Sequence, residues 1–212
     1  MDPLKIMYEK SGKKVCENLK KRFFDAYYVN TKEEALSKAL ELIPQNHSVS
    51  WGGCITMEEI GLKDALQKKG YTLIDRDTAN TPEERVELMH KALSCGTYIM
   101  SANAISADGQ LVNIDGNGNR VAALCYGPKN ILVLAGMNKV VNTVEDAVKR
   151  ARTIAAPANK QRFENLKTPC SFTGQCADCF MEESICNQFV VTRLSHPKDR
   201  IKVILIGEDL GL

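Results

Sequence analysis

The fold is decided by one stretch at residues 48–74, SVSWGGCITMEEIGLKDALQKKGYTLI. It begins with a short apolar run at Ser48–Trp51, continues with apolar residues at helical spacing over Met57–Lys69, and ends with a second apolar run at Tyr71–Ile74. Gly70 ends the helix, since glycine is the residue that most often terminates one. A strand, a helix and a strand in this order predict a right-handed crossover, which places the two strands parallel in one sheet.

The same alternation continues on both sides of this stretch. The helices that we predict are Lys5–Arg22, Glu33–Ile43, Pro82–Leu93 and a segment that begins at Thr143 and ends near Thr153. The predicted strands are Asp25–Val29, Thr97–Ser101, Asn130–Ala135, Phe189–Thr192 and Ile201–Ile206. Strands separated by helices of about ten to fifteen residues are typical of parallel sheets. We therefore predict an α/β fold with a mixed, mainly parallel sheet and flanking helices, and we treat residues 1–212 as one domain.

Two glycine-containing turns lie in the middle of the chain, at Asp108-Gly109 and at residues 115–119. They separate short apolar segments at Leu111–Ile114 and Val121–Cys125. This spacing is typical of two-residue hairpin connections and their longer relatives. The sequence therefore predicts a β-hairpin insertion into the sheet.

Carboxylates, amides and a guanidinium are concentrated around these two turns. Asp108 or Asp115 is a candidate acid or base, because a carboxyl group can transfer a proton to a bound substrate. Arg120 is a candidate partner for an anionic group, and Asn117 and Asn119 are candidate ligand-binding residues beside it. The alternative is that the aspartates and asparagines only form turns.

A glycine turn joins the strand Ser48–Trp51 to the helix that begins at Met57. Gly52 and Gly53 allow the backbone to approach a ligand, and amides at the start of a helix attract anions such as phosphate or carboxylate. Gly52, Gly53 and Thr56 are therefore candidate anion-binding residues. The alternative is a tight turn in which Thr56 only caps the helix. The pattern is neither a Rossmann nor a Walker sequence, so it does not indicate a nicotinamide dinucleotide or ATP.

Lys139 follows the apolar strand Asn130–Ala135. It is expected near the carboxyl edge of the sheet, where open α/β folds bind ligands, and is a candidate catalytic residue. The alternative is a solvated surface charge. The three histidines, His47, His90 and His196, are not spaced for a catalytic dyad or a zinc triad, and we assign them no role.

Four of the eight cysteines are placed together, within an irregular loop at residues 168–187. They are Cys170, Cys176, Cys179 and Cys186, in the pattern C-x5-C-x2-C-x6-C. Thiolates repel one another, and a loop with few apolar residues cannot hold itself by burial, so a soft cation would supply both neutralisation and folding energy. A [4Fe–4S] cluster is the first expectation, structural zinc the second, and metal-free thiols the third.

Composition excludes several classes of protein. The chain of 212 residues carries 28 basic and 26 acidic residues, a formal charge of +2, so it offers no broad cationic face for nucleic acid. The N-terminal residues MDPLKIMYEKSGKK carry charges where a secretory signal needs an apolar run, and no run of about 18 uncharged apolar residues follows. We expect a cytoplasmic protein with no membrane partner.

Four segments together resemble the LUD-domain family, which includes bacterial lactate-utilization protein C. They are SVSWGGCITMEEIGL, SADGQLVNIDGNGNRVAAL, GPKNILVLAGMNKVV and TPCSFTGQCADCFMEESICN. The resemblance covers essentially the whole chain. It implies the sheet architecture shared by ribose-5-phosphate isomerase, glucosamine-6-phosphate deaminase and coenzyme A transferases. In those relatives the first glycine turn binds phosphate or a similar anion, and Gly52, Gly53 and Thr56 are the matching positions. Asp108, Asp115 and Lys139 resemble isomerase acid/base residues only loosely.

Three functions follow from the residues and the resemblance together. The first is a protein of lactate or hydroxy-acid metabolism that binds a small carboxylate or phosphate anion and uses its metal centre for electron transfer. The second is an isomerase- or transferase-like enzyme on phosphosugars or acyl groups, with a structural zinc. The third is a non-catalytic subunit that docks an iron–sulfur or ferredoxin-like protein through apolar residues of the cysteine loop, such as Phe172 and Phe180. A homodimer is compatible with each.

Overall fold

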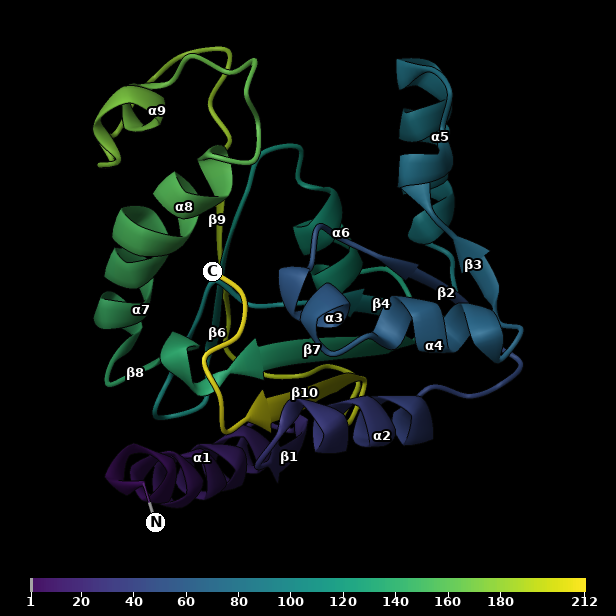
Figure 1. The fold of residues 1–212 in the computed structure, drawn as a ribbon, viewed down its shortest axis with the longest axis vertical. Coiled ribbons are helices and arrows are strands. Elements are labelled where there is room, and N and C mark those ends of the chain that lie inside the picture. Colours follow the sequence, from purple (N-terminus) through teal and green to yellow (C-terminus); the bar gives the residue numbers. More distant parts are fainter. Residues whose placement is uncertain (1) are drawn as a thin grey trace.

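A computed structural model describes residues 2–212 and contains two sheets (Figure 1). The larger sheet has six strands in the order β1-β10-β7-β4-β2-β3, and every neighbouring pair is parallel. These strands are β1 (Asp25–Val29), β2 (Ser48–Trp51), β3 (Thr72–Ile74), β4 (Thr97–Met100), β7 (Asn130–Gly136) and β10 (Ile201–Ile206). The predicted α/β fold with a mainly parallel sheet is therefore confirmed.

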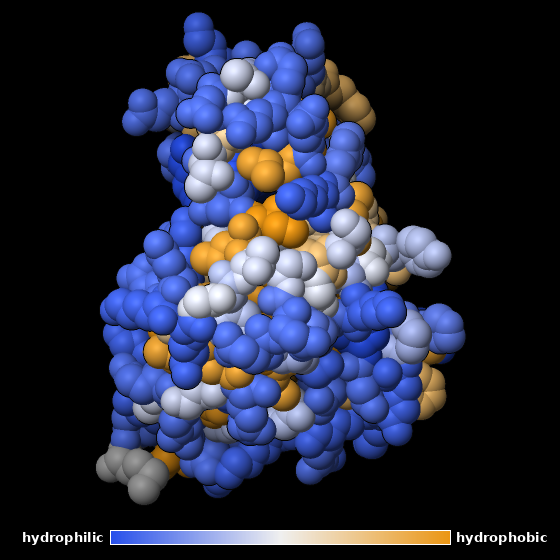
Figure 2. Space-filling view, turned by 90° about the vertical axis from the view of Figure 1, so that its right-hand side faces the viewer, coloured by the Kyte–Doolittle hydropathy of each residue, from blue (hydrophilic) through white to orange (hydrophobic). Residues whose placement is uncertain are grey.

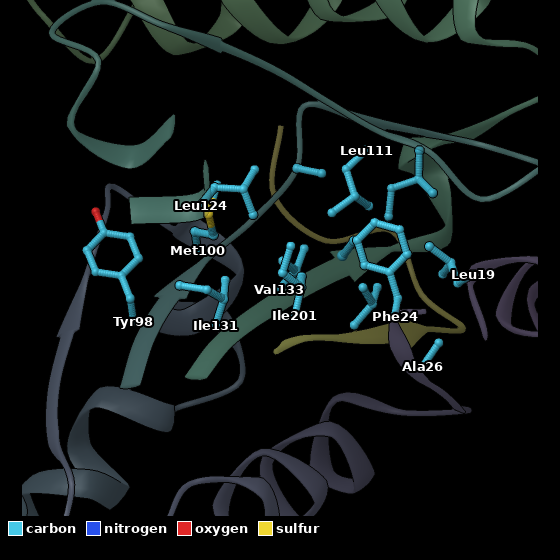
Figure 3. Packing of buried hydrophobic residues seen from close by; sticks show 14 of the residues in the cluster. Leu19, Phe24, Ala26, Tyr98, Met100, Leu111, Leu124, Ile131, Val133 and Ile201 are labelled. Atoms are coloured by element: carbon cyan, nitrogen blue, oxygen red, sulfur yellow. The ribbon is translucent and has the colours of Figure 1, made fainter. Parts of the chain in front are cut away.

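Helices cover both faces of this sheet. They are α1 (Pro3–Lys21), α2 (Lys32–Leu42), α3 (Ile55–Glu59), α4 (Leu62–Lys68), α5 (Pro82–Ala92) and α6 (Asn119–Cys125). One core lies between the sheet and α2, α3 and α4, and the other lies between the sheet and α1, α5 and α6. Figure 3 shows the second core, where the ring of Phe24 lies between Leu19 and Leu111. Residues of β7 alternate between the two cores, as its apolar sequence predicted.

The smaller sheet has four strands in the order β8-β5-β6-β9. They are β5 (Ala104–Ser106), β6 (Leu111–Asp115), β8 (Val140–Val141) and β9 (Gln188–Thr192). One face packs on a long helical segment made of α7 (Val144–Arg150), the π-helical turn η3 (Ala151–Ala155) and α8 (Ala156–Lys160). The cysteine loop, with the short helix α9 (Pro169–Thr173), connects α8 to β9.

Three sequence-based expectations need correction. Val121–Cys125 is not a hairpin strand but part of α6, because the carboxylate of Asp115 accepts hydrogen bonds from the amides of Arg120 and Val121 and so starts a helix. The hairpin is β5–β6 instead, with its turn at Asp108-Gly109. The helix predicted at Met57–Lys69 is two helices, broken where Gly61 adopts a left-handed backbone (φ 69°).

The surface is mainly hydrophilic on the face shown in Figure 2, with hydrophobic residues gathered in a band across its upper half. No helix in the described part of the chain, residues 2–212, combines the length and apolar character that a membrane span requires.

Candidate functional site

A cavity of about 560 Å³ lies at the carboxyl ends of β2, β4 and β7. Its floor includes the glycine turn after β2, Ser101 after β4, and Lys139 in η2 (Met137–Lys139) after β7. One wall comes from α5 and from η1 (Arg76–Thr78), and the opposite wall from residues 155–166 and 182–185. Figure 1 shows α5 on one side of this region and α7 and α8 on the other. The carboxyl edge is where parallel α/β sheets bind their ligands.

The glycine turn lets a side chain pack closely against the backbone, and it leaves one backbone amide without a hydrogen-bond acceptor in the described part of the chain. Gly52 is buried, and its amide donates to the carbonyl of Ile99 on β4 (3.1 Å). A Cβ at this position would lie 2.5 Å from Cδ of Arg120, so only glycine lets that side chain pack across the turn. Gly53 is exposed, and its amide donates no hydrogen bond to residues 2–212. Since α3 has only five residues, its dipole contributes little here.

Two guanidinium groups flank Gly53 from opposite walls of the cavity. Arg76 Nη2 and Arg162 Nη1 each lie 3.5 Å from the position that a Cβ on Gly53 would take. Arg162 forms no ion pair within residues 2–212, and its Nη1 donates to Asn159 Oδ1 at 3.3 Å. Arg76 is only weakly paired, with its Nε 3.9 Å from a carboxylate oxygen of Asp77. Two cations beside an unused amide form an arrangement suited to an anion.

Asp115 holds Arg120 at the edge of the cavity. One carboxylate oxygen accepts from the amides of Arg120 (2.9 Å) and Val121 (3.1 Å), and the other accepts from the amide of Gly116 (3.0 Å) and from Arg120 Nε (3.4 Å). Arg120 also donates from Nη2 to the carbonyl of Ile114 (2.5 Å). Because both oxygens of Asp115 are occupied, the geometry favours a positioning role for this residue over proton transfer.

Lys139 is a buried cation on the cavity floor. Only 3% of the residue is exposed, and its Nζ donates to Ser101 Oγ at 2.8 Å. No carboxylate within residues 2–212 lies at ion-pair distance from it. Burial lowers the pKa of Lys139 to about 8, opposed by Cys54 and assisted by the positive charge of Arg150. An amine in this state is partly unprotonated near neutral pH.

The comparisons with known proteins agree with this architecture. A family model, described as the LUD domain, matches residues 12–206. The chain belongs to the LUD-domain family. A search of curated proteins gives no match. Among solved structures, a DUF162 family protein from Deinococcus radiodurans, determined at 1.70 Å resolution, is similar with a TM-score of 0.50 and 11% identity, over 95% of this chain and 98% of that one. At this identity the likeness shows the fold alone.

The fold of this LUD domain brings most of the candidate site residues to one cavity. Gly52, Gly53, Asp115, Asn117, Asn119, Arg120 and Lys139 all line it. Asp108 lies elsewhere, in the β5–β6 turn, where its carboxylate pairs with Arg22 (2.5 Å) and accepts from Ser106 Oγ (2.5 Å). Thr56 is fully buried, and its Oγ1 has no hydrogen-bond partner within residues 2–212. Neither Asp108 nor Thr56 lines the cavity.

Three other residues that line the cavity, Arg76, Ser101 and Arg162, were not identified from the sequence. Arg76 had a usable signal, because it follows the strand Thr72–Ile74 and so lies at the carboxyl edge of the sheet. Ser101 ends the predicted strand Thr97–Ser101 and had the same signal. Arg162 had none, since it lies just after α8, in a stretch that showed no periodicity. Only the three-dimensional path of the chain places it over Gly53.

The four loop cysteines of the LUD domain line a second, smaller cavity of about 40 Å³. They are Cys170, Cys176, Cys179 and Cys186, and all are free thiols. The pKa of Cys186 is raised to about 11, mainly by burial and to a smaller extent by the other three thiols. Within residues 2–212, no three Cys, His, Asp or Glu side chains are already arranged in metal-binding geometry. Four thiols around one space fit a thiophilic ion or cluster as donors, and binding would have to draw them together.

The cysteine loop also forms part of the wall of the larger cavity. Residues 182–185 line that cavity, between the third and fourth cysteines. The amide of Asn187 donates to the carbonyl of Asp115 (2.9 Å), and its side chain donates to the carbonyl of Gly116 (3.1 Å). A Cβ on Gly116 would lie 3.3 Å from Cα of Ile185. The loop therefore rests directly on the turn that holds Arg120.

Proposed function

We propose that this LUD-domain protein acts in hydroxy-acid metabolism, binds a small carboxylate or phosphate anion in the larger cavity, and holds a metal centre in its four-cysteine loop. The anion lies over Gly53, between the guanidinium groups of Arg76 and Arg162. Arg120 and Lys139 contact its deeper end. The loop, with its metal, fixes the wall that carries residues 182–185.

The pair of guanidinium groups beside Gly53 is the observation that carries the anion proposal. The cavity as a whole is not strongly positive, since Glu58, Asp77, Asp115, Glu182 and Glu183 also line it. Glu58 and Glu182 are exposed, Asp77 and Asp115 are paired with Arg85 and Arg120, and Glu183 accepts a hydrogen bond from the amide of Lys167 (2.5 Å). Local charge decides where an anion binds, because interactions between solvated charges are screened within about 10 Å. The atoms nearest to a Cβ on Gly53 would be guanidinium nitrogens of Arg76 and Arg162.

The thiol donor set supports a metal centre beside this site. Cys170, Cys176, Cys179 and Cys186 would hold the ion or cluster, and a cluster would supply one-electron transfer. Arg152, which lines the same small cavity, is paired with Asp178 (2.5 Å) and helps to close it. Because the loop contacts Asp115 and Gly116, binding of the metal stabilises the position of Arg120 as well.

Fluorescence of the single tryptophan, Trp51, tests the anion proposal, because this residue lines the cavity. We expect inorganic phosphate or lactate to change the emission with saturation. Arg162→Gln should weaken the binding about tenfold, the effect of losing one charge-assisted hydrogen bond. Arg193→Gln, an exposed arginine outside the cavity, is the matched control and should bind as the native protein does. The absence of saturation, or equal affinity in both variants, would reject the anion site.

Anaerobic purification with metal analysis tests the metal proposal. Iron with a broad visible absorbance band is the expected result and supports electron transfer. Colourless protein that contains zinc would contradict electron transfer and support the isomerase- or transferase-like alternative, in which the metal is structural. Protein with neither metal, and with four reactive thiols, would reject a metal centre.

A second candidate function, docking of an iron–sulfur protein, is favoured by two exposed aromatic side chains. Phe172 and Phe180 are 77% and 97% exposed and lie within the cysteine loop. Exposed aromatic side chains on one loop favour a protein-interaction surface there. A two-cluster ferredoxin is the probe, and its binding should fall in the double variant Phe172→Ser, Phe180→Ser. Equal binding by that variant would reject docking through this loop.

A further inference from the structure

We propose that Lys139 is an amine nucleophile, which forms an imine with a carbonyl compound that carries an anionic group. The inference rests on the proposed anion site and adds a substrate class and a covalent step to it. It follows from where the amine lies, from what surrounds it, and from what the cavity offers to a ligand.

The amine of Lys139 lies at the cavity without a carboxylate partner among the described residues. Lys139 lines the cavity floor, and its only hydrogen bond within residues 2–212 goes to Ser101 Oγ (2.8 Å). A structural buried lysine is normally paired with a carboxylate, which holds it protonated and so removes the lone pair that a nucleophile needs. Here no such pair exists within the described residues. The amine therefore has no charge partner among residues 2–212 at the cavity that Lys139 lines, and Gly211 of the C-terminal segment packs against it, since a Cβ there would lie 2.8 Å from Nζ.

Two arginines lie near the amine of Lys139 and disfavour its protonation. Arg150 is buried, and its guanidinium is fixed by the carbonyls of Asn138 (3.0 Å) and Asn103 (2.6 Å). Arg150 and Arg120 both lower the pKa of Lys139, in addition to the main effect of burial, whereas Cys54 and Glu59 raise it. Neighbouring cations and desolvation are the two means by which proteins keep a lysine unprotonated for covalent catalysis.

The ligand must suit both an unprotonated amine and the cations beside it. An unprotonated amine reacts with a carbonyl carbon, and the cations that suppress its protonation attract negative charge. Arg120 lies at the same cavity, with its Nε and Nη2 directed to Asp115 and Ile114 and its Nη1 making no hydrogen bond within residues 2–212. A compound with a carbonyl next to a carboxylate satisfies both groups. Its carboxylate also neutralises the positive iminium that forms.

The reaction balances with the groups present. The Nζ lone pair attacks the carbonyl carbon, the carbon–oxygen double bond becomes a single bond, and one proton moves from nitrogen to oxygen to give a carbinolamine. The hydroxyl group then leaves as water after it gains a proton, and the carbon–nitrogen double bond forms. Ser101 Oγ, which is hydrogen-bonded to Nζ, is placed to relay these protons. No oxidant or reductant takes part.

Reductive trapping tests the proposal. The purified protein is incubated with pyruvate and sodium cyanoborohydride, which reduces an imine to a stable secondary amine, and is then analysed by intact-mass and peptide mass spectrometry. We expect one captured pyruvate per chain, on the peptide that contains Lys139. Lys139→Met should lose this product. Lys129→Met, which removes an exposed lysine outside the cavity, should retain it. Acetone, an uncharged carbonyl compound, should be captured at least tenfold more slowly.

The results separate this inference from the anion proposal. Capture that is spread over surface lysines and is unchanged in Lys139→Met, or no capture at all, would overturn the imine. If Trp51 still responds to phosphate in that case, the anion site stands without the covalent step. Phosphate should also slow the capture of pyruvate, because both occupy the same cavity. Capture at Lys139 that phosphate does not slow, with no response from Trp51, would leave the amine reactive and reject the anion site.

Discussion

The amine of Lys139 lies where its charged form is poorly solvated, and this affects stability. Its pKa is about 8 in the folded protein against 10.5 for an ordinary lysine, so the unfolded chain binds more protons between those values. The burial of the Lys139 charge therefore destabilises the folded protein fully below pH 8, and this effect disappears as the pH rises towards 10.5. The groups that face Lys139 are Cys54, Glu59, Arg120 and Arg150.

Replacing Lys139 by Met removes this cost. We expect the free energy of unfolding at pH 7 to rise by about 1–3 kcal/mol, since each pKa unit corresponds to about 1.4 kcal/mol and the hydrogen bond to Ser101 is lost. The difference between the variant and the native protein should shrink between pH 8 and pH 10. Chemical denaturation over this pH range measures both quantities. If Lys139→Met is less stable than the native protein at pH 7, or if the difference in stability between the two does not depend on pH, the buried charge of Lys139 is not destabilising.

Gly52 and Gly53 are adjacent but should respond differently to alanine. A Cβ on Gly52 would lie 2.5 Å from Cδ of Arg120. The Arg120 side chain cannot easily move away, because its Nε is hydrogen-bonded to Asp115 and its Nη2 to the carbonyl of Ile114. Gly52→Ala should therefore cost about 1–3 kcal/mol of stability, as other overpacked sites do. A Cβ on Gly53 meets only ordinary contacts at 3.5 Å, so Gly53→Ala should change stability by less than about 1 kcal/mol. Denaturation midpoints check the pair, and equal effects would refute the packing of Arg120 against Gly52.

Among single residues, sequence reasoning identified some that carry a local signal, overlooked others that carry the same signal, and could not identify those that carry none. Lys139 and Arg76 each follow a predicted strand, a position that the parallel sheet turns into its ligand-binding edge. Lys139 was recognised on this basis and Arg76 was not. Arg162 and Gly53 are more than a hundred residues apart, and nothing in the local pattern joins them. Asp108 and Asp115 both lie in predicted glycine-containing turns, so the local sequence does not distinguish them. The pairing of β5 with β6 places Asp108 in a hairpin turn, where it pairs with Arg22.

Among the elements, the cysteine loop is the one whose stability we expect to depend on the proposed metal. Cys176→Ser should reduce the metal content and lower the melting temperature together, because the metal supplies folding energy to the loop. Cys125→Ser is the matched control, since Cys125 is exposed at the end of α6 and lies outside the loop. Elemental analysis and thermal melting of both variants measure the two effects. If Cys176→Ser keeps its metal and its melting temperature, the coordinating role of the loop fails.

The elements that sequence reasoning predicted best are those with a single strong pattern. β1, β2 and β10 have the predicted bounds, because apolar runs flanked by turn residues specify buried strands. Val121–Cys125 is also a short apolar run, yet it is a helix, since Asp115 caps its first amides. A run of this length fits a strand or a helix equally well, and tertiary contacts decide. The helix after Thr143 also continues past Thr153, through a π-helical turn to Lys160.

For the whole molecule, the proposed ligand connects two walls that the chain builds from distant parts. Arg76 precedes α5, and Arg162 follows α8. Phosphate at about a hundred times its dissociation constant should therefore stabilise the protein by about 2.7 kcal/mol and raise the melting temperature by about 5–10 °C. Chloride at the same ionic strength is the control. The shift should be much smaller in Arg162→Gln, and an equal shift with chloride would indicate a general salt effect.

A crystal structure with selenate is the most direct test of whether the cavity binds an anion over Gly53. Selenium scatters X-rays anomalously, so the position of the ion can be read without reference to the protein. We predict an anomalous peak within hydrogen-bonding distance of Arg76 Nη2, Arg162 Nη1 and the amide of Gly53. Selenate bound elsewhere on the protein, with no peak in this cavity, would contradict anion binding at this site.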